Sequence, residues 1–239
     1  MAMLVNFAAA PVAPSPVVRG AVPTMSGSKD LKALATELNP VIGYYDPINL
    51  AEWNLYGKGD DATVGFLRHA EIKHGRVAMA AFVGYCVQAN GLKFPWEPFT
   101  SISATSPPEQ WDALPEAAKW QIILFIGFLE VYSEHSFILE KQGQAHYMKG
   151  GKPGYFPKLD SLPHPVPLNL FDPFGLSKNA SPETKAKGLL KEVNNGRLAM
   201  IGIFGFLAEN KVPGSVPFGP HLAAYSGNVM APFEMNYHF

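Results

Sequence analysis

The sequence has a single cysteine and almost no net charge, and these scarcities exclude several classes of protein. Cys86 has no partner for an internal disulfide, so disulfides do not hold this fold together. With 19 basic and 20 acidic residues, the chain gives no reason to expect a nucleic-acid partner. It also lacks a Ser-His-Asp set, a phosphate-binding loop and a dinucleotide fingerprint, so nothing in it indicates an enzyme.

Acidic residues are absent from the start of the chain. Residues 1–29 are rich in Ala, Val, Pro and Ser and carry Arg19, a composition that predicts a plastid transit segment or N-terminal extension. Residues 30–239 are of a length that fits one domain. The stretch from Asp30 to Asp61 contains several Pro and Gly residues, and we expect it to be irregular.

A short stretch occurs twice in the chain, and the second copy keeps the main charges of the first. Residues 71–79 read EIKHGRVAM, and residues 192–200 read EVNNGRLAM. Both copies lie in proline-free segments rich in helix formers, which predicts helices over residues 62–90 and 183–210. A duplicated element indicates one structural unit used twice about a pseudo-two-fold axis.

Long apolar runs are also missing. The uncharged parts of the two helices, residues 77–87 and 198–208, are shorter than the roughly 20 residues that a bilayer span needs. If these helices do span a membrane, the Glu and Arg of each copy lie in or beside the hydrocarbon. Charges there are costly unless they are paired, and they usually mark a function.

The spacing of these charges predicts how they pair. Glu and Arg of one copy are five positions apart, which places them badly for a pair within one helix. We therefore expect two crossed helices that exchange partners, Glu71 with Arg197 and Glu192 with Arg76. Small residues are expected to permit the close approach at the crossing. They are Gly75, Ala78, Gly196 and Ala199.

A third helix is expected between the two copies, over residues 115–139, with Asp112 close to its capping position. Basic residues are distributed unevenly around it. The loop before it, residues 92–118, has Lys93 alone, whereas the loop after it has eight lysines: Lys141, Lys149, Lys152, Lys158, Lys178, Lys185, Lys187 and Lys191. Three crossings would place this second loop on the side of the N-terminus, as the positive-inside rule expects.

The predicted fold class is therefore an all-α membrane protein with three transmembrane helices. The first and third cross as a pseudo-two-fold pair, the loops are long and irregular, and a short amphipathic helix is expected over Pro220–Tyr225. Loops of more than about 20 and about 40 residues are unusual for a compact domain. A large bound non-protein component would fill the space between so few helices.

The paired motifs, ExxHGRxAM then ExxNGRxAM, resemble those of the light-harvesting chlorophyll-binding proteins of photosynthetic membranes, from about Pro40 to the C-terminus. The residues around them, Ala70–His74 and Asp172–Leu176, resemble the algal chlorophyll a/c antennae of the fucoxanthin or peridinin type. Lys152–Tyr155 and Ser226–Phe233 are similar to dinoflagellate members.

This resemblance implies an antenna that binds chlorophyll a, chlorophyll c and a carotenoid of the peridinin, fucoxanthin or diadinoxanthin type. It implies a multi-pass protein of the plastid thylakoid membrane with a stromal N-terminus. Its partners would be a photosystem core, neighbouring antenna subunits and thylakoid lipids. A photoprotective quencher of the same family is an alternative, which three acidic residues of the lumenal loop are too few to decide: Glu97, Glu109 and Asp112.

The resemblance also implies which residues act. Magnesium prefers oxygen ligands and accepts imidazole, and the only metal expected is that of chlorophyll. The expected axial ligands are Glu71, His74, Glu192, Asn195, Gln121, Glu130, Gln88, Glu209 and His221. Arg76 and Arg197 would neutralise the motif carboxylates. Glu209 departs from the glutamine that the family often has there. Three other histidines are expected at the surface: His69, His146 and His164.

Two Asp-Pro segments precede the repeated helices, Asp46-Pro47 and Asp172-Pro173. By resemblance they would seat carotenoid end groups, and by sequence alone they are equally well ordinary turns before a helix.

Three readings from other classes compete with the antenna. A carboxylate-bridged di-metal enzyme also uses Glu-x-x-His on helices, but here the second copy has Asn195 and each copy carries an arginine that repels a dication. An inverted-repeat transporter would need more spans and a broken helix. Two surface helices of a soluble bundle would not need the same charges at the same offsets.

Overall fold

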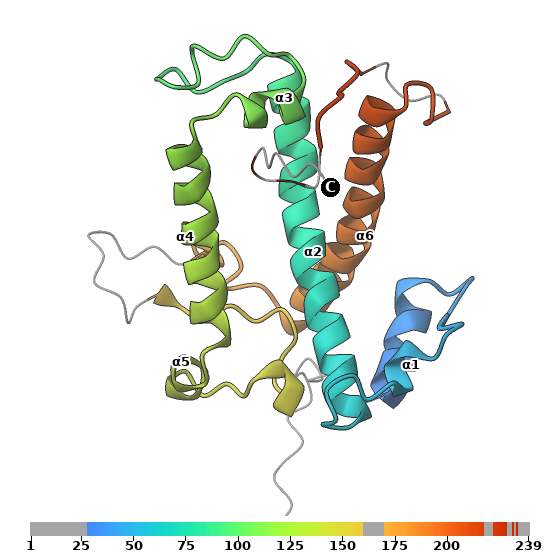
Figure 1. Ribbon diagram of the computed structural model, residues 1–239. Coiled ribbons are helices and arrows are strands. Elements are labelled where there is room, and N and C mark those ends of the chain that lie inside the picture. The colour runs from blue at the N-terminus through green and yellow to red at the C-terminus, as the bar shows by residue number, and fades with distance from the viewer. Residues whose placement is uncertain (1–27, 160–169, 218–221, 229–230, 232, 234–239) are drawn as a thin grey trace, which may run out of the picture.

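The computed structural model describes residues 28–159, 170–217, 222–228, 231 and 233, and all regular structure in these residues is helical (Figure 1). The elements are α1 Ser28–Leu38, η1 Leu50–Glu52, α2 Asp60–Ala89, α3 Pro107–Asp112, α4 Glu116–Glu134, α5 Ser136–Lys141, η2 Tyr147–Lys149 and α6 Pro182–Lys211. The expected helical class is confirmed. The expected N-terminal extension lies outside the described residues except for Ser28 and Lys29, which begin α1.

Helices α2 and α6 form the centre of the molecule and cross each other (Figure 1). Each has 30 residues, or about 45 Å at 1.5 Å per residue. Helix α6 starts where local chemistry favours it, because the Ser181 hydroxyl accepts a hydrogen bond from Thr184 N at 3.2 Å and Pro182 occupies the first turn. Their bounds match the two helices expected from the repeat to within two residues.

The crossing is built on two glycines. A Cβ atom on Gly75 would lie 3.0 Å from Cα of Gly196, and a Cβ on Gly196 would lie 2.9 Å from Cα of Gly75. The backbones therefore touch where the repeat places equivalent residues. Further along, Tyr85 packs on its equivalent, Phe206, with ring centroids 4.9 Å apart. Contacts between equivalent positions are the signature of a two-fold relation between the helices.

Helix α4 stands apart from the crossed pair (Figure 1) and, among the described elements, makes most of its close contacts with α5. The sequence predicted one helix to Leu139, and this was wrong. His135 is extended, at φ −69° and ψ 120°, and α5 starts again at Ser136. The redirected turn buries Leu139 and lets the Gln142 side chain bond Tyr155 and Lys158, each at 2.9 Å. These tertiary contacts are invisible in the local pattern.

Two further expectations need correction. The stretch from Asp30 was expected to be irregular, but α1 forms there because Leu34 and Leu38 pack on Val193 of α6, the main buried apolar cluster in the described part. The short helix expected over Pro220–Tyr225 is not seen where the structure describes that segment, since residues 222–226 are irregular. Tyr225 N instead bonds the Asn210 carbonyl at 2.8 Å, which ties this segment to the end of α6.

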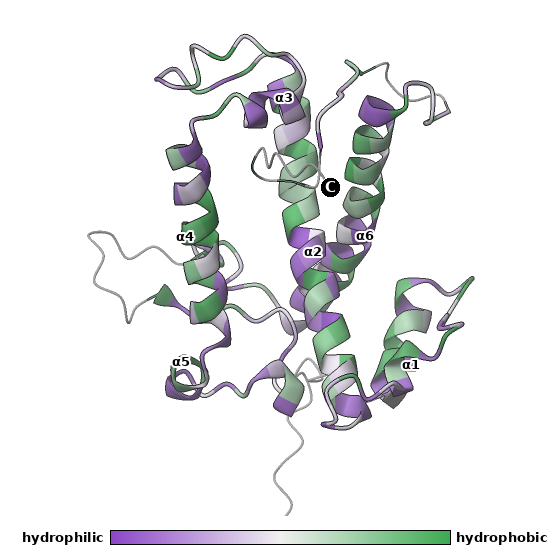
Figure 2. Ribbon diagram, in the orientation of Figure 1, coloured by the Kyte–Doolittle hydropathy of each residue, from purple (hydrophilic) through white to green (hydrophobic). Residues whose placement is uncertain are grey.

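Apolar surface is unevenly placed on the helices. Figure 2 shows hydrophobic residues along α4 and along the C-terminal halves of α2 and α6, with polar residues gathered around the crossing. Several large side chains of α4 are exposed: Trp120, Ile122, Leu124, Phe125, Ile126, Phe128 and Val131. Contiguous exposed apolar surface on a protein usually marks an interaction or membrane-facing site. Judged by length and hydropathy alone, no helix in the described ranges is apolar enough to cross a membrane.

Candidate functional site

The charged residues of the two repeats meet at the crossing of α2 and α6. Arg76 Nε lies 2.6 Å from Glu192 Oε1, and Arg197 Nε lies 2.6 Å from Glu71 Oε1. Both pairs join different helices, which is the exchange that the five-residue spacing predicts. Charge-assisted hydrogen bonds of this length are strong. They cancel four charges that would otherwise be costly in an apolar environment.

The two halves of the crossing differ in their outer partners. Arg68, one turn before Glu71, pairs with the second carboxylate oxygen of that residue. On the other side, Arg76 Nη1 donates to the Gly154 carbonyl at 2.6 Å. Glu71 is thus held by two arginines, whereas Glu192 is bonded by Arg76 through Oε1. Arg68 was missed in the sequence analysis because its equivalent in the second repeat is Leu189.

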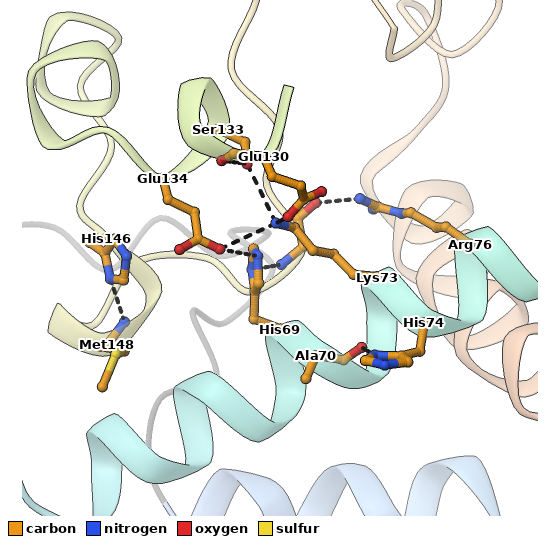
Figure 3. A network of polar contacts seen from close by, with 11 residues as sticks. His69, Ala70, Lys73, His74, Arg76, Glu130, Ser133, Glu134, His146 and Met148 are labelled. Atoms are coloured by element: carbon orange, nitrogen blue, oxygen red, sulfur yellow. Dashed lines mark hydrogen bonds and ion pairs between the residues drawn. The ribbon is translucent and has the colours of Figure 1, made fainter. Parts of the chain in front are cut away.

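Each crossed helix also presents a neutral donor on its outer surface, three residues after its carboxylate. His74 is exposed, and its Nδ1 lies 2.8 Å from the Ala70 carbonyl (Figure 3). Since a carbonyl only accepts, Nδ1 carries a proton, and in the neutral imidazole this leaves the lone pair on Nε2. Asn195 is exposed at the matching place on α6. Both side chains are free to act as ligands from their helices.

The two residues expected to act on α4 lie in different surroundings. Gln121 is exposed on the apolar stretch of the helix. Glu130 Oε2 lies 2.5 Å from Lys73 Nζ of α2, while half of the Glu130 side chain, 51%, remains exposed. Figure 3 shows Lys73 reaching from α2 to Glu130, Ser133 and Glu134 of α4. The sequence contains a signal for this contact, because the first motif has Lys73 where the second has Asn194.

His69 is not a surface residue, contrary to the prediction. It is 5% exposed, its ring stacks on Tyr147 at 3.9 Å, and Nδ1 accepts a hydrogen bond from Gly154 N at 3.0 Å. Nε2 therefore carries the proton; it lies 3.9 Å from Glu134 Oε1 (Figure 3) and has no hydrogen bond within the described residues. The burial arises because the loop after α5 folds back over α2, where Gly65 leaves room for the Tyr147 carbonyl.

The other two histidines expected at the surface have separate outcomes. His146 is half-buried, and its Nδ1 accepts a hydrogen bond from Met148 N at 3.2 Å (Figure 3). Burial lowers the pKa of His146 below its ordinary value. His164 lies outside the described residues.

The candidates at the far ends of the repeats have different outcomes. Gln88 is exposed and lines two adjoining cavities of about 380 and 550 Å³ beside α3. Glu209 was expected to be a ligand, but it is 3% exposed, and its two oxygens accept hydrogen bonds from Gly214 N at 2.8 Å and Val216 N at 3.0 Å. Its carboxylate fixes the turn after α6, so we withdraw it as a ligand. His221 lies outside the described residues.

A polar strap that the sequence analysis missed ties the ends of α2, α3 and α6 together. Asn210 accepts a hydrogen bond from the Tyr85 hydroxyl and donates to the Ala223 carbonyl at 2.5 Å. The Tyr225 hydroxyl donates to Asp112 Oδ2 at 2.6 Å. Asp112 was expected at the cap of the middle helix and instead ends α3. Nothing in the local sequence relates these five residues.

The two Asp-Pro segments form turns held by their aspartates. Asp46 accepts hydrogen bonds from Leu50 N at 2.9 Å and Ala51 N at 3.0 Å, and the bond from Ala51 is the main cause that lowers the pKa of Asp46. Asp172 accepts from Ser177 N at 2.9 Å and Ser177 Oγ at 2.5 Å, and the hydroxyl bond is the main cause that lowers its pKa. A cavity of about 510 Å³ lies between the Asp46 turn and Arg197.

The arrangement offers single donors rather than a metal cage. In the part of the chain that the structure describes, no three His, Cys, Asp or Glu side chains gather closely enough to hold a metal ion. The candidate donors are instead spread over the outer faces of α2, α4 and α6. Such an arrangement suits several large ligands that each need one axial donor.

The comparisons with known proteins agree with this geometry. The family model described as chlorophyll A-B binding protein matches residues 31–211. The chain is 32% identical over 178 residues to the chloroplastic fucoxanthin-chlorophyll a-c binding protein F of Phaeodactylum tricornutum, covering 72% of this chain and 76% of that protein. It is 31% identical over 218 residues to the chloroplastic fucoxanthin-chlorophyll a-c binding protein A of Macrocystis pyrifera, covering 88% and 89%.

The chain therefore belongs to the chlorophyll-binding light-harvesting family, a class of pigment carriers and not of enzymes. Within that family it belongs to the algal chlorophyll a/c type. A third relative, the chloroplastic fucoxanthin-chlorophyll a-c binding protein of Trieres chinensis, is 30% identical over 185 residues, covering 74% of this chain and 78% of that protein.

Proposed function

We propose that this protein is a light-harvesting antenna of the plastid thylakoid that carries chlorophyll a, chlorophyll c and a fucoxanthin-type carotenoid. The observation that carries the proposal is the reciprocal pairing of Arg76 with Glu192 and of Arg197 with Glu71. It gives two carboxylates neutralised from the opposite helix. A neutral donor follows each of them on an exposed helix face.

The donor chemistry fits chlorophyll magnesium, a hard cation that takes oxygen or imidazole ligands. When bound, the pigments absorb light and pass on the excitation; the protein fixes their spacing and excludes water. The residues that would hold the magnesium ions are, in chain order, Glu71, His74, Gln88, Gln121, Glu130, Glu192 and Asn195. All of them are exposed or partly exposed. His74 fits best, because its bond to the Ala70 carbonyl orients the ring through Nδ1 and leaves Nε2 as the ligand atom of the neutral imidazole.

The membrane placement follows from how the charges are compensated. Five charged residues of α2 and α6 are paired across helices, and pairing removes most of the penalty for charge at the edge of the hydrocarbon. They are Glu71, Lys73, Arg76, Glu192 and Arg197. Helix α4, with 19 residues, is about 28 Å long, close to the thickness of a bilayer core. We infer that α2, α4 and α6 span the membrane, with the lysine-rich loop and the N-terminus in the stroma.

The Asp46 and Asp172 turns would seat the carotenoid end groups. Exposed aromatic and aliphatic side chains surround them, among them Tyr45 and Ile48 in the first and Phe171, Phe174 and Leu176 in the second. A polyene end group would cover these side chains. The remaining apolar surface of α4 would face thylakoid lipid, neighbouring antenna subunits or a photosystem core.

An absorption and fluorescence-excitation spectrum of the protein, purified in mild detergent, tests the proposal. We expect chlorophyll a emission that is excited through the chlorophyll c and carotenoid bands. A purified protein without pigment would refute the antenna function. Pigments that absorb without feeding chlorophyll a emission would instead favour a quencher.

A further inference from the structure

Lys73 is the cation that bridges the crossed pair and α4. Its Nζ lies 2.5 Å from Glu130 Oε2, 3.3 Å from Glu134 Oε1 and 3.4 Å from Ser133 Oγ (Figure 3). The Lys73 side chain is 22% exposed and that of Glu130 is 51% exposed. The cation is thus largely covered, while the carboxylate keeps an open side.

Helix α4 has no cation of its own near Glu130. Its lysine, Lys119, lies three turns away and donates to the Asp112 carbonyl at 3.0 Å. Neighbouring positions on the Glu130 surface of the helix carry Ile126, Gly127, Ser133 and Glu134, and none of these is a cation. Any compensation of the Glu130 charge must therefore come from another element, and Lys73 is placed to supply it.

We propose that Lys73 is the charge partner that enables Glu130 to ligate a chlorophyll on α4. The inference rests on the proposed function and deepens it, because it assigns to Lys73 the role that Arg76 and Arg197 have at the crossing. Lys73 supplies one positive charge, and Glu130 is the nearer of the two carboxylates that it contacts, at 2.5 Å against 3.3 Å for Glu134 at the end of α4. With its own charge compensated by the lysine, the Glu130 carboxylate can ligate a neutral pigment in an apolar setting.

The second repeat shows that this role is specific to the side of the molecule that faces α4. Asn194 occupies the position of Lys73, and its side-chain amide donates to the Leu38 carbonyl of α1 at 3.3 Å. No carboxylate faces Asn194 in the described contacts, and no cation is placed there. Lys73 is therefore not a feature that the two repeats share, and its partner is the Glu130 carboxylate on α4.

Refolding with a chlorophyll and carotenoid extract, followed by pigment counting per chain, tests the role. Lys73→Met should lose about one chlorophyll, because each magnesium that loses its axial ligand leaves with its ring. The double variant Lys73→Met with Glu130→Gln should recover it, since an amide oxygen is a neutral ligand that needs no cation. Lys191→Met, which removes an exposed lysine of α6, is the matched control and should keep the full count.

The outcomes separate the possible failures. A full pigment count in Lys73→Met, or a double variant that stays as deficient as the single one, would overturn the compensation by Lys73. If Lys73→Met does not refold, the double variant decides: refolding with pigment supports the proposal, and failure of both shows that the pair only joins the helices. A wild-type chain that takes up no chlorophyll would overturn the antenna function itself.

Discussion

Adding one methyl group at Gly75 tests whether the close approach of α2 and α6 organises the crossing. In the Gly75→Ala variant, the new Cβ would lie 3.0 Å from Gly196 Cα and 3.5 Å from its carbonyl carbon. Carbon atoms prefer separations of about 3.5–4.0 Å. Because the opposing atoms belong to a backbone, they cannot rotate away, and the helices must separate by about 0.5–1 Å.

The energies of this substitution can be weighed. Overpacking of a tight contact costs about 1–3 kcal/mol. Replacing a helical glycine by alanine stabilises the helix by about 0.5–1 kcal/mol. Gly188→Ala isolates this second effect, because Gly188 lies on α6 with nothing within 4 Å of its added Cβ. The difference between Gly75→Ala and Gly188→Ala is then the cost of the crossing, about 1–3 kcal/mol.

The assay is the temperature at which the refolded, pigmented protein loses its visible circular dichroism. At about 2–4 °C per kcal/mol for a chain of this size, Gly75→Ala should melt several degrees below Gly188→Ala. Gly196→Ala should behave like Gly75→Ala, because the two contacts are reciprocal. If Gly75→Ala melted at or above the temperature of Gly188→Ala, the inference that the crossing has no room for a side chain would be refuted.

Three other predictions concern charges and the polar strap. Arg76→Leu should prevent pigment-dependent refolding, and the swapped double variant Arg76→Glu with Glu192→Arg should partly restore the fold without the pigment at that site; no rescue would count against cross-pairing. Hydrogen bonding lowers the pKa of Asp172 in the folded state. The stabilisation of the fold by its ionised carboxylate is therefore complete above the unfolded pKa of about 3.9, and it is lost only as the pH falls through the folded pKa. Spectra should therefore not change between about pH 5 and 8 on its account, and Ser177→Ala should raise the pKa seen by carboxyl NMR. Asn210→Ala should cost about 1–3 kcal/mol in thermal melts, because it leaves the buried Tyr85 hydroxyl without its acceptor, and a change below about 0.5 kcal/mol would contradict this.

The repeat carried more structural information than any other feature of the sequence. The spacing of Glu71 and Arg76 forces a partner on another helix, and the second copy supplies it, so the ion pairs of the crossing could be predicted. The small residues of the motif predicted where the backbones meet. Both predictions needed only residues close together in the sequence and one assumption of symmetry.

The errors occurred where a loop or a turn folds back onto a residue of a helix. His69 has polar neighbours in the sequence, yet the loop carrying Tyr147 and Gly154 covers it. Glu209 was expected to be a ligand from the resemblance, but its carboxylate is bonded by the backbone of the turn that follows it. The end of α4 at His135 depends on contacts with residues beyond α5. None of these contacts has a signature in local composition or spacing.

The equivalent positions Lys73 and Asn194 show how one duplicated helix serves two surroundings. Each side chain reaches from the crossed pair to the neighbour on its own side, Lys73 to Glu130 of α4 and Asn194 to the Leu38 carbonyl of α1. Residues at the crossing are kept between the copies because each must match its own equivalent. Residues on the outer faces do not contact their equivalents, so each can match the flanking element that it contacts instead. Differences between the copies at these outer positions therefore point to side chains that contact flanking elements.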